Sequence, residues 1–317
     1  MAEQWNARTV RRLGEELSNW GRWGPDDERG TLNFITPECV LAACALPRRG
    51  LVISCALPFD QDGPQEGPGP RHNPVHTMLA SGEGALAGEQ NFPGGFQYAD
   101  DAITMPLQCG TQWDGLAHVF YDGKMYNDRD IALVTRHGAQ SNGIEHMANG
   151  VVGRGVLLDL PRALGRPWLD DGTPVFARDL DVCAERLGVT IERGDILLVR
   201  TGMLTRCLAQ DSFAGYCGGS APGLSLDCAR WLYEREIAAV ATDTWSVEVR
   251  PHETPDCIHP LHMVALRDMG LLFGEIFQLD RLSEACADDG LYAFLFAAPP
   301  LPVTGAVGSP INPVAIK

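Results

Sequence analysis

The sequence predicts a single-domain α/β protein over residues 1–317. Short apolar runs such as GDILLVRTG (194–202) alternate along the chain with helix-like segments such as DLDVCAERLGV (179–189). Short apolar runs bounded by turn residues are typical of strands that are covered on both faces. With 45% hydrophobic and 21% charged residues, the chain also has the composition of a globular protein that buries a substantial core.

The first part of the chain, residues 1–50, is predicted to be a helical extension. A helix is expected over residues 8–20, and the glycines and proline at 20–27 indicate a turn after it. A second helix is expected over residues 36–44, because a threonine suits its N-cap and a proline occupies its first helical position.

The remaining elements follow from further apolar runs and turn signals. A strand is expected at 51–59, and the density of glycine and proline at 62–74 indicates a surface loop without regular structure. No internal repeat is found. The later elements are predicted, in order, as a strand at 151–160, a helix at 179–189, a strand at 194–202, and a helix from 228 that runs into a strand at 237–243.

The charge balance argues against several classes of partner. The 25 Lys and Arg residues are outnumbered by 41 Asp and Glu residues, and the net charge of -16 would repel nucleic-acid phosphates and anionic lipid. No apolar stretch reaches the roughly 18 residues that span a bilayer, and the polar N-terminus does not resemble a secretory signal. No dinucleotide-binding or P-loop glycine motif occurs. We therefore expect a cytoplasmic protein that acts on a small molecule and uses no nucleotide cofactor.

A candidate active site lies in the stretch QCGTQWDGLAHVFYD (108–122). In an extended strand one face would carry its alternate residues, Gln108, Gly110, Gln112 and Asp114. Four strand residues cover about 13 Å, so the polar groups converge only if the chain bends, which Gly110 and Gly115 permit. His118 follows four positions after the aspartate and is a candidate general base. From spacing alone, a half-buried strand with solvent-facing polar side chains is the alternative.

Aromatic and sulfur side chains accompany this stretch. Strand alternation points Cys109 away from the polar face, which disfavours it as a nucleophile. The ten cysteines of the chain include no CxxC pair and are expected to be core residues or free thiols. Four aromatic residues either line a substrate pocket or pack in the core: Trp113, Phe120, Tyr121 and Tyr126.

The other histidines are weaker candidates. His72 and His76 are four residues apart, but the proline between them argues against a helical metal-binding face, so we expect them at the surface. His146 is expected to have a structural or pocket-lining role. His137 and His252 have no supporting context and are expected at the surface.

The stretch QCGTQWDGLAH resembles the HxGTHxDxPxH signature of the cyclase family, which includes bacterial kynurenine formamidases, isatin hydrolases and trans-dienelactone hydrolases. Gln108 and Gln112 occupy the positions of the two motif histidines, and Leu116 replaces the motif proline. Other segments are similar to the longer members of this family, among them NWGRWGPDDERGTLNFITPE, IAAVATDTWSVEV and PPLPVTGAVGSPINPVAI. The resemblance implies a mixed, curled β-sheet flanked by helices, assembled as a homodimer or homotetramer.

The resemblance also implies a metal site. In metal-dependent members the two motif histidines and the aspartate hold a divalent ion, and a later histidine and glutamate complete the site. Glutamine is a poor ligand for zinc, so the two amides leave open one divalent ion (Mn²⁺, Mg²⁺ or Zn²⁺, with the hard ions favoured) or none. The residues of this chain that correspond to the family's metal ligands are Gln108, Gln112, Asp114, His262 and Glu275. His259 is an alternative to His262 at the histidine position.

The activity that the resemblance implies is hydrolysis of an amide or of a cyclic ester or amide, as in arylformamidases and lactonases. His118 would act as the general base, assisted by Asp114. Two alternatives stay open: a metal-independent lyase or cyclase that acts on a small metabolite, and a catalytically silent homologue that binds a ligand. The residues expected to contact the substrate are Gln108, Gln112, Trp113, Phe120 and Tyr121.

Overall fold

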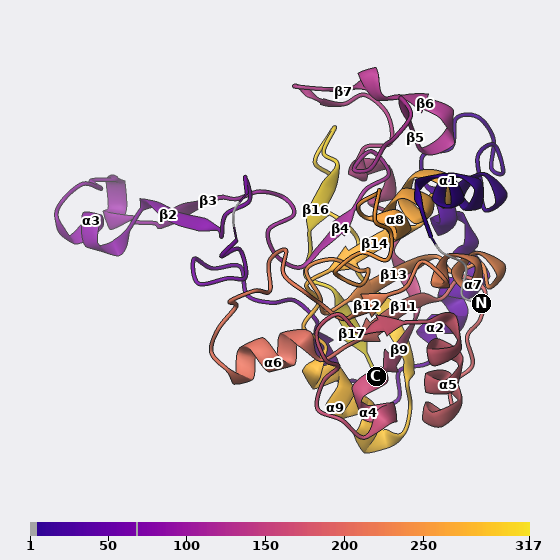
Figure 1. The fold of residues 1–317 in the computed structure, drawn as a ribbon. Coiled ribbons are helices and arrows are strands. Elements are labelled where there is room, and N and C mark those ends of the chain that lie inside the picture. The colour runs from indigo at the N-terminus through magenta and orange to yellow at the C-terminus, as the bar shows by residue number, and fades with distance from the viewer. Residues whose placement is uncertain (1–4, 68) are drawn as a thin grey trace.

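A nine-stranded mixed sheet organises the fold, as Figure 1 shows for a computed structural model that describes residues 5–67 and 69–317. Four central strands run parallel, and antiparallel strands flank them on both sides. The mixed α/β class expected from the sequence is therefore confirmed. The order across the sheet is β1 (Val52–Ser54), β17 (Val314–Ile316), β15 (Ala293–Ala297), β9 (Val152–Asp159), β11 (Ile196–Arg200), β13 (Ala239–Thr242), β14 (Leu272–Glu275), β4 (Gln112–Asp114) and β16 (Gly308–Pro310).

Helices cover the sheet and its ends. The second helix, α2, packs against β9 and β15, and α5 packs against β9. None of the helices in the described part of the chain combines the length and apolar character that a bilayer span requires. The α-helices are α1 (Ala7–Glu16), α2 (Pro37–Cys44), α3 (Gly82–Leu86), α4 (Leu160–Leu164), α5 (Ala177–Leu187), α6 (Met203–Ala209), α7 (Cys228–Glu234), α8 (Pro260–His262) and α9 (Asp280–Asp289).

Shorter helical segments connect these elements. The most important for the site is η6 (Met263–Met269), a π-helical continuation of α8 against which α1 packs. The others are 3₁₀ turns: η1 (Gly30–Phe34), η2 (Pro93–Gly95), η3 (Tyr126–Asp128), η4 (Ile131–Leu133) and η5 (Ile144–Met147).

Two-stranded pairs lie outside the main sheet. The longest joins β2 (Val75–Ala80) to β3 (Asp100–Thr104) and forms, with α3, an arm that projects from the body of the molecule (Figure 1). Every residue of β3 is exposed, and the sequence analysis did not anticipate this arm. The other pairs are β5 (Lys124–Met125) with β6 (Arg129–Asp130), β7 (Val134–Thr135) with β8 (Gly138–Ala139), and β10 (Pro174–Val175) with β12 (Gly223–Leu224).

The N-terminal helices agree with the sequence except at one end. The helix expected over 8–20 stops at Glu16, because the backbone N–H of Asn19 donates to Asp268 O at 3.0 Å instead of continuing the helix. The second expected helix is α2, and the Thr36 hydroxyl accepts a hydrogen bond at its N-cap, as predicted. The first four residues of the expected extension lie outside the described residues.

The predicted strands are confirmed in position but not always in length. The strand expected over 51–59 is reduced to β1, since the N–H of Leu57 donates to the Thr111 hydroxyl at 2.8 Å and the chain leaves the sheet. The later predictions correspond to β9, α5, β11, α7 and β13. The loop 62–74 has no regular structure in its described residues, which exclude residue 68, but Gly63 to Gln65 are buried, so it is not simply a surface loop.

Candidate active site

Strand β4 places the polar side chains of the motif on one face and its tryptophan on the other. Gln112 and Asp114 are both buried and, two residues apart, share a face. The indole N–H of Trp113 donates to Ala298 O at 2.8 Å, and its ring centroid lies 5.3 Å from that of Phe277. The expectation that Trp113 contacts the substrate is therefore wrong, because the alternation of the strand turns it into the core.

Strand β14 supplies a glutamate that meets the polar face. Glu275 is directly opposite Gln112 in the antiparallel register of β4 and β14, and Gln112 Nε2 donates to Glu275 Oε2 at 2.7 Å. The neighbouring Gly274 has no room for a side chain, because a Cβ would lie 2.6 Å from the Trp113 ring. Close packing on one face of this strand pair thus fixes the carboxylate on the other.

The turn before β4 separates Gln108 from Gln112. Gln108 lies in a turn and bend that end where β4 begins, so the two glutamines are not residues of one strand. Its Nε2 atom is buried without a hydrogen-bond partner among the described residues, beside Gly308 of β16, where a Cβ would be 2.5 Å away. Gly308 pairs directly with Asp114, so the Gln108 side chain beside it lies on the face of the sheet that carries Asp114, although Gln108 itself precedes β4.

Two glycines of the motif make room for their neighbours rather than supply unusual backbone conformations. Neither Gly110 nor Gly115 has a positive φ. A Cβ on Gly110 would lie 2.6 Å from the ring of Phe59, and one on Gly115 would lie 3.0 Å from Val307 O. The chain does bend here, as expected, but the requirement for glycine is steric.

His118 lies in the turn that follows β4. Its backbone N–H donates to Gly115 O at 3.0 Å, and this turn brings its Nε2 atom to 3.6 Å from Asp114 Oδ1. Burial raises the pKa of Asp114, while the positive charges of His118 and His262 oppose that effect. The Asp114 side chain is almost fully buried and that of His118 is 23% exposed, so the histidine is the member of the pair that a solvent molecule reaches.

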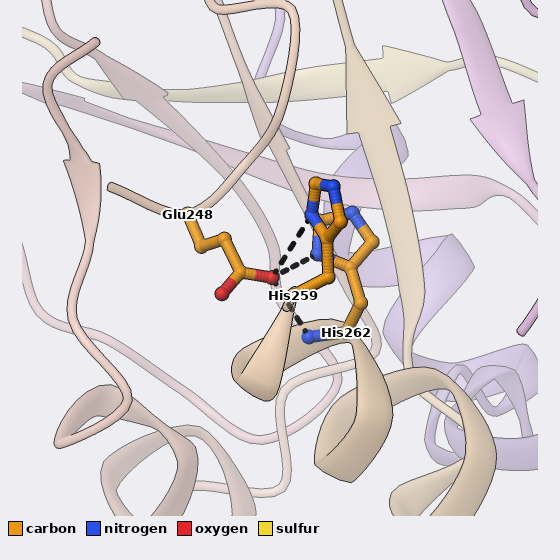
Figure 2. A group of neighbouring side chains, drawn as sticks. All are labelled: Glu248, His259 and His262. Atoms are coloured by element: carbon orange, nitrogen blue, oxygen red, sulfur yellow. Dashed lines mark hydrogen bonds and ion pairs between the residues drawn. The ribbon is translucent and has the colours of Figure 1, made fainter. Parts of the chain in front are cut away.

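His262 enters the site from α8 and is held by Glu248 (Figure 2). The Glu248 carboxylate accepts hydrogen bonds from His262 Nδ1 and from the backbone N–H groups of Leu261 at 3.2 Å and His262 at 3.1 Å. His262 Nε2 lies 3.3 Å from Glu275 Oε1. A histidine whose Nδ1 is fixed by a carboxylate presents Nε2 in one direction. Glu248, which the sequence analysis did not identify, thus orients His262 toward Glu275.

The buried charges of this cluster stabilise one another. Burial alone would lower the pKa of His262, but its hydrogen bonds with Glu248 and Glu275 raise that pKa to about 10. Burial would raise the pKa of either glutamate, yet the hydrogen bonds and charges of the histidines hold both below their usual range. In this arrangement His262 is a proton donor between two carboxylates.

Two further histidines lie next to Glu248. His259, at the N-cap of α8 with a φ of 51°, places Nδ1 3.5 Å from Glu248 Oε1 (Figure 2). The His252 ring lies 4.4 Å from the His259 ring, and burial lowers the pKa of His252 to about 4. The expectation that His252 is a surface residue is wrong, since its side chain is only 11% exposed and packs in this cluster. Of the two rivals, His262 is the one that contacts Glu275.

A pocket of about 350 Å³ connects these groups. Two of its residues were not identified from the sequence: Arg71 from the loop 62–74, which has no motif, and Trp245 after β13, whose segment resembles the family but was given no site role. A larger cavity, of about 740 Å³ beside α1, contains none of the candidate residues. The predicted site residues that the pocket brings together are Asp114, His118, Phe120, Tyr121, His262 and Glu275.

The remaining candidates lie outside this pocket. Burial raises the pKa of Cys109 to about 11, so its thiol stays protonated at neutral pH and is a poor nucleophile. Tyr126 is fully buried and donates its hydroxyl proton to Asp27, which makes it a core residue. His146 is exposed and lies 2.6 Å from a Glu28 oxygen. The histidines found at the surface, as expected, are His72, His76 and His137.

The acidic part of the pocket fits a hard divalent ion. One carboxylate oxygen from each of Asp114 and Glu275 and one nitrogen of His262 lie within 4.8 Å of one another. Asp114 Oδ1 and Gln112 Oε1 are buried and have no hydrogen-bond partner among the described residues. Unpartnered buried oxygens are costly unless a ligand binds them, and a set dominated by oxygen is the kind that Mn²⁺ or Mg²⁺ prefers.

Two solved structures with this fold share low sequence identity with the chain. Isatin hydrolase A from Labrenzia aggregata is 18% identical, with 87% of this chain and 95% of that chain covered and a TM-score of 0.61. A protein from Bacillus stearothermophilus described as a "predicted metal-dependent hydrolase" is 20% identical, with 84% and 97% covered and a TM-score of 0.52. These two similarities establish the fold alone. Among curated proteins, no match was found.

A crystal structure described as a novel cyclase is more similar to the chain than these two. It is 39% identical to this chain, with 96% of this chain and 99% of that chain covered and a TM-score of 0.87. The Cyclase family model independently matches residues 36–249, which is more than half of the sequence and includes the whole signature stretch. By sequence and by fold, this chain belongs to the cyclase family.

Proposed function

We propose that this protein is a hydrolase that cleaves an amide or a cyclic ester or amide, with His118 as the general base. The observation that carries the proposal is the pair formed by His118 Nε2 and Asp114 Oδ1, 3.6 Å apart in a pocket that also contains His262 and Glu275. A histidine beside a buried carboxylate is suited to accept a proton from water, because the carboxylate stabilises the imidazolium that forms. Structural neighbours named isatin hydrolases support a cyclic amide as one substrate type.

In the proposed reaction, His118 removes a proton from water while the water oxygen forms a bond to the carbonyl carbon of the substrate. That carbon then loses its bond to nitrogen, or to the ring oxygen of a lactone, and the imidazolium of His118 returns the proton to the leaving atom. Asp114 holds the imidazole in place and stabilises its charge between the two steps. The products are a carboxylic acid and an amine or an alcohol.

Asp114, Glu275 and His262 would hold a divalent ion, with Gln112 Oε1 as a neutral ligand. His262 would have to lose its Nε2 proton, which faces Glu275, before that nitrogen could bind the ion. When bound, the ion would polarise the substrate carbonyl and lower the pKa of water at this position. The protein's own residues prepare the set: Gln112 fixes the Glu275 carboxylate from across the strand pair, and Glu248 fixes the imidazole of His262. Because the ligand atoms are mainly oxygens, Mn²⁺ or Mg²⁺ suits them better than Zn²⁺.

A metal-independent lyase or cyclase is the second candidate. Hydrogen bonds within the ligand set favour it: Gln112 Nε2 and His262 Nε2 both contact the Glu275 carboxylate, at 2.7 Å and 3.3 Å. A carboxylate neutralised in this way is stable without an ion. In this reaction His118 would remove a proton from the substrate itself, and the leaving group or ring-closing atom would come from the same molecule.

Turnover and metal content, measured on the same samples, separate the two candidates. Protein purified without added metal would be assayed on formanilide, isatin and an aromatic lactone before and after chelation, with elemental analysis of each sample. The hydrolase proposal expects hydrolysis of at least one substrate, loss of activity on chelation, and recovery with Mn²⁺. Hydrolysis by metal-free protein would contradict the role of the ion, and a folded protein that turns over none of the three would contradict hydrolysis.

A further inference from the structure

Arg71 brings a positive charge into the pocket. It is the only arginine among the pocket-lining residues, which include Asp114 and Glu275. Its Cζ atom lies 5.4 Å from the centroid of the Trp245 ring, and its Nη1 donates to Gln108 O at 3.3 Å. In the described part of the chain no carboxylate forms an ion pair with it. A guanidinium has five N–H donors, so most of those of Arg71 are available to a ligand.

The loop 62–74 that carries Arg71 is built to hold this position. The buried Gln65 donates from Nε2 to Cys109 O at 2.9 Å, and its Oε1 accepts from Trp245 Nε1 at 3.3 Å. Asn73 closes the loop, since its Oδ1 accepts from Gln65 N at 2.8 Å and its Nδ2 donates to Gly63 O at 2.9 Å. One segment therefore positions both the arginine and the aromatic ring beneath it.

Contact with an aromatic ring leaves the N–H donors of an arginine able to bind a ligand. A guanidinium that lies over an aromatic ring uses its face for that contact and keeps its N–H groups in its own plane, where a carboxylate can accept two of them. The pocket offers further aromatic surface from Phe120 and Tyr121. It therefore combines a flat apolar environment with the positive charge of Arg71, while a second arginine, Arg250, lies 5.7 Å from the Trp245 ring centroid but is not among the pocket-lining residues.

The other charged pocket residues contact one another, and the positive charge of Arg71, which forms no ion pair among the described residues, also helps to lower the pKa of Asp114 and Glu275. Glu275 contacts His262 and Gln112, and Asp114 lies beside His118. Arg71 is the exception in a chain whose net charge is -16, where carboxylates outnumber arginines and lysines by a wide margin. The nearby Asp114 and Glu275 would repel a doubly charged phosphate more strongly than a singly charged carboxylate.

We propose that Arg71 is a specificity-determining residue that binds a carboxylate substituent of a planar, aromatic or conjugated substrate. The inference rests on the hydrolase proposed above and adds the class of substrate: an amide, or a cyclic ester or amide, that carries a carboxylate beside the bond to be cleaved. The carboxylate produced by hydrolysis has the same chemistry, so the experiment must separate a substituent from a product group.

Binding measurements test Arg71 independently of turnover. Benzoate and benzamide are matched probes that differ in charge, and their binding to the wild-type protein and to Arg71→Gln and Arg71→Lys would be measured by isothermal titration calorimetry. We expect Arg71→Gln to weaken benzoate binding on the order of 10- to 100-fold and to leave benzamide unchanged, because it removes a charge-assisted pair. Arg71→Lys should restore part of the difference.

A matched control is Arg235→Gln. Arg235 lies over the Trp231 ring, with 4.3 Å from Cζ to the ring centroid, but it is the C-cap residue of α7 and is not among the pocket-lining residues. The Arg235→Gln variant should bind benzoate and benzamide as the wild-type protein does. Circular dichroism should report the same fold for all variants. If folded Arg71→Gln binds benzoate as tightly as the wild-type protein, the inference is wrong.

Kinetics separate the two sources of the carboxylate. The substrates are 2-formamidobenzoate, which carries a carboxylate beside the amide, and formanilide, which does not. A substituent site predicts that Arg71→Gln lowers kcat/KM for the first by about tenfold or more and leaves the second unchanged. An equal loss for both would mean that Arg71 acts on the reacting group and would overturn the inference. If the wild-type protein hydrolyses neither, the hydrolase proposal fails while the calorimetry still decides the role of Arg71.

Discussion

Gln112 donates a 2.7 Å hydrogen bond from Nε2 to Glu275 Oε2 across the antiparallel pair β4–β14. This contact explains what a glutamine does at a position where the family signature has a histidine. The Gln112 amide occupies one hydrogen-bonding position of the Glu275 carboxylate. The Oε1 atom of Gln112 has no hydrogen-bond partner among the described residues. A site of this kind disfavours a soft metal and keeps its glutamate in a fixed geometry.

We expect Gln112→His to raise the affinity for Zn²⁺ by about tenfold or more, because imidazole is a better zinc ligand than an amide and this position faces Glu275. Competition with a chromogenic chelator would measure the gain. Gln108→His would be measured beside it, because the Gln108 side chain lies beside Gly308 on the face that carries Asp114. An unchanged Zn²⁺ affinity in Gln112→His would contradict the role given to this position.

Replacing the proposed base should remove activity without unfolding the protein. We expect His118→Ala to reduce kcat by roughly 10²- to 10⁴-fold, the usual contribution of a positioned general base. His146→Ala is the control, because His146 is an exposed histidine that contacts a glutamate outside the pocket. Steady-state kinetics and thermal melting would be measured on both. Turnover by His118→Ala at the wild-type rate would remove His118 from the mechanism.

Glu248 should act on the site through His262. Loss of the negative charge in Glu248→Gln releases the imidazole, so we expect Mn²⁺ affinity to fall by about 10- to 100-fold, as for other partners of metal-binding histidines. Equilibrium dialysis with elemental analysis would measure this affinity.

Glu253→Gln is the control for this substitution. Glu253 also accepts hydrogen bonds, from the Ser225 hydroxyl and from Leu226 N, but it does not contact His262. It should lower the melting temperature without changing Mn²⁺ affinity. An unchanged affinity in Glu248→Gln would show that this carboxylate only stabilises the fold.

The buried His252 predicts a loss of stability in mild acid. Its pKa is lowered from 6.5 to about 4 by burial, so in this range the unfolded chain binds more protons than the folded one. The contribution of neutral His252 to stability is therefore complete above about pH 6.5 and decreases as the pH falls toward 4. Melting temperatures measured across this range should fall less steeply in His252→Gln than in the wild-type protein.

His137→Gln is the matched control, because His137 is exposed and its substitution should leave the pH dependence unchanged. If His252→Gln and the wild-type protein lose stability in parallel between pH 6.5 and 4, other groups govern the acid transition.

The sequence predicted local features well and three-dimensional contacts poorly. The class of the fold and the positions of β9, α5 and β11 follow from apolar runs, which depend only on neighbouring residues. The strand alternation used for the motif also implied that Trp113 faces away from Gln112 and Asp114, and the structure agrees with that geometry. The pocket role expected for Trp113 came from its position near the signature, which carries no information about the face on which it lies.

The residues that the sequence did not indicate reach the site from distant segments. Glu248 lies in the segment IAAVATDTWSVEV, whose resemblance to the family assigned it no role, and Arg71 lies in a loop without a motif. Both matter because the chain brings them to His262 and Trp245. The exposed arm was missed for a different reason. Its strands are exposed along their length, so they lack the alternation of apolar and polar residues that marks a half-buried strand.

The braced loop 62–74 has a practical consequence for engineering. It contributes Arg71 and supports Trp245 through Gln65, whereas the proposed base His118 and its partner Asp114 belong to β4 and the turn after it. Selectivity and bond cleavage are thus encoded in separable stretches of the gene. A library confined to this loop, with Gln65 and Asn73 kept as its frame, would sample new substrate preferences while leaving the reaction centre intact.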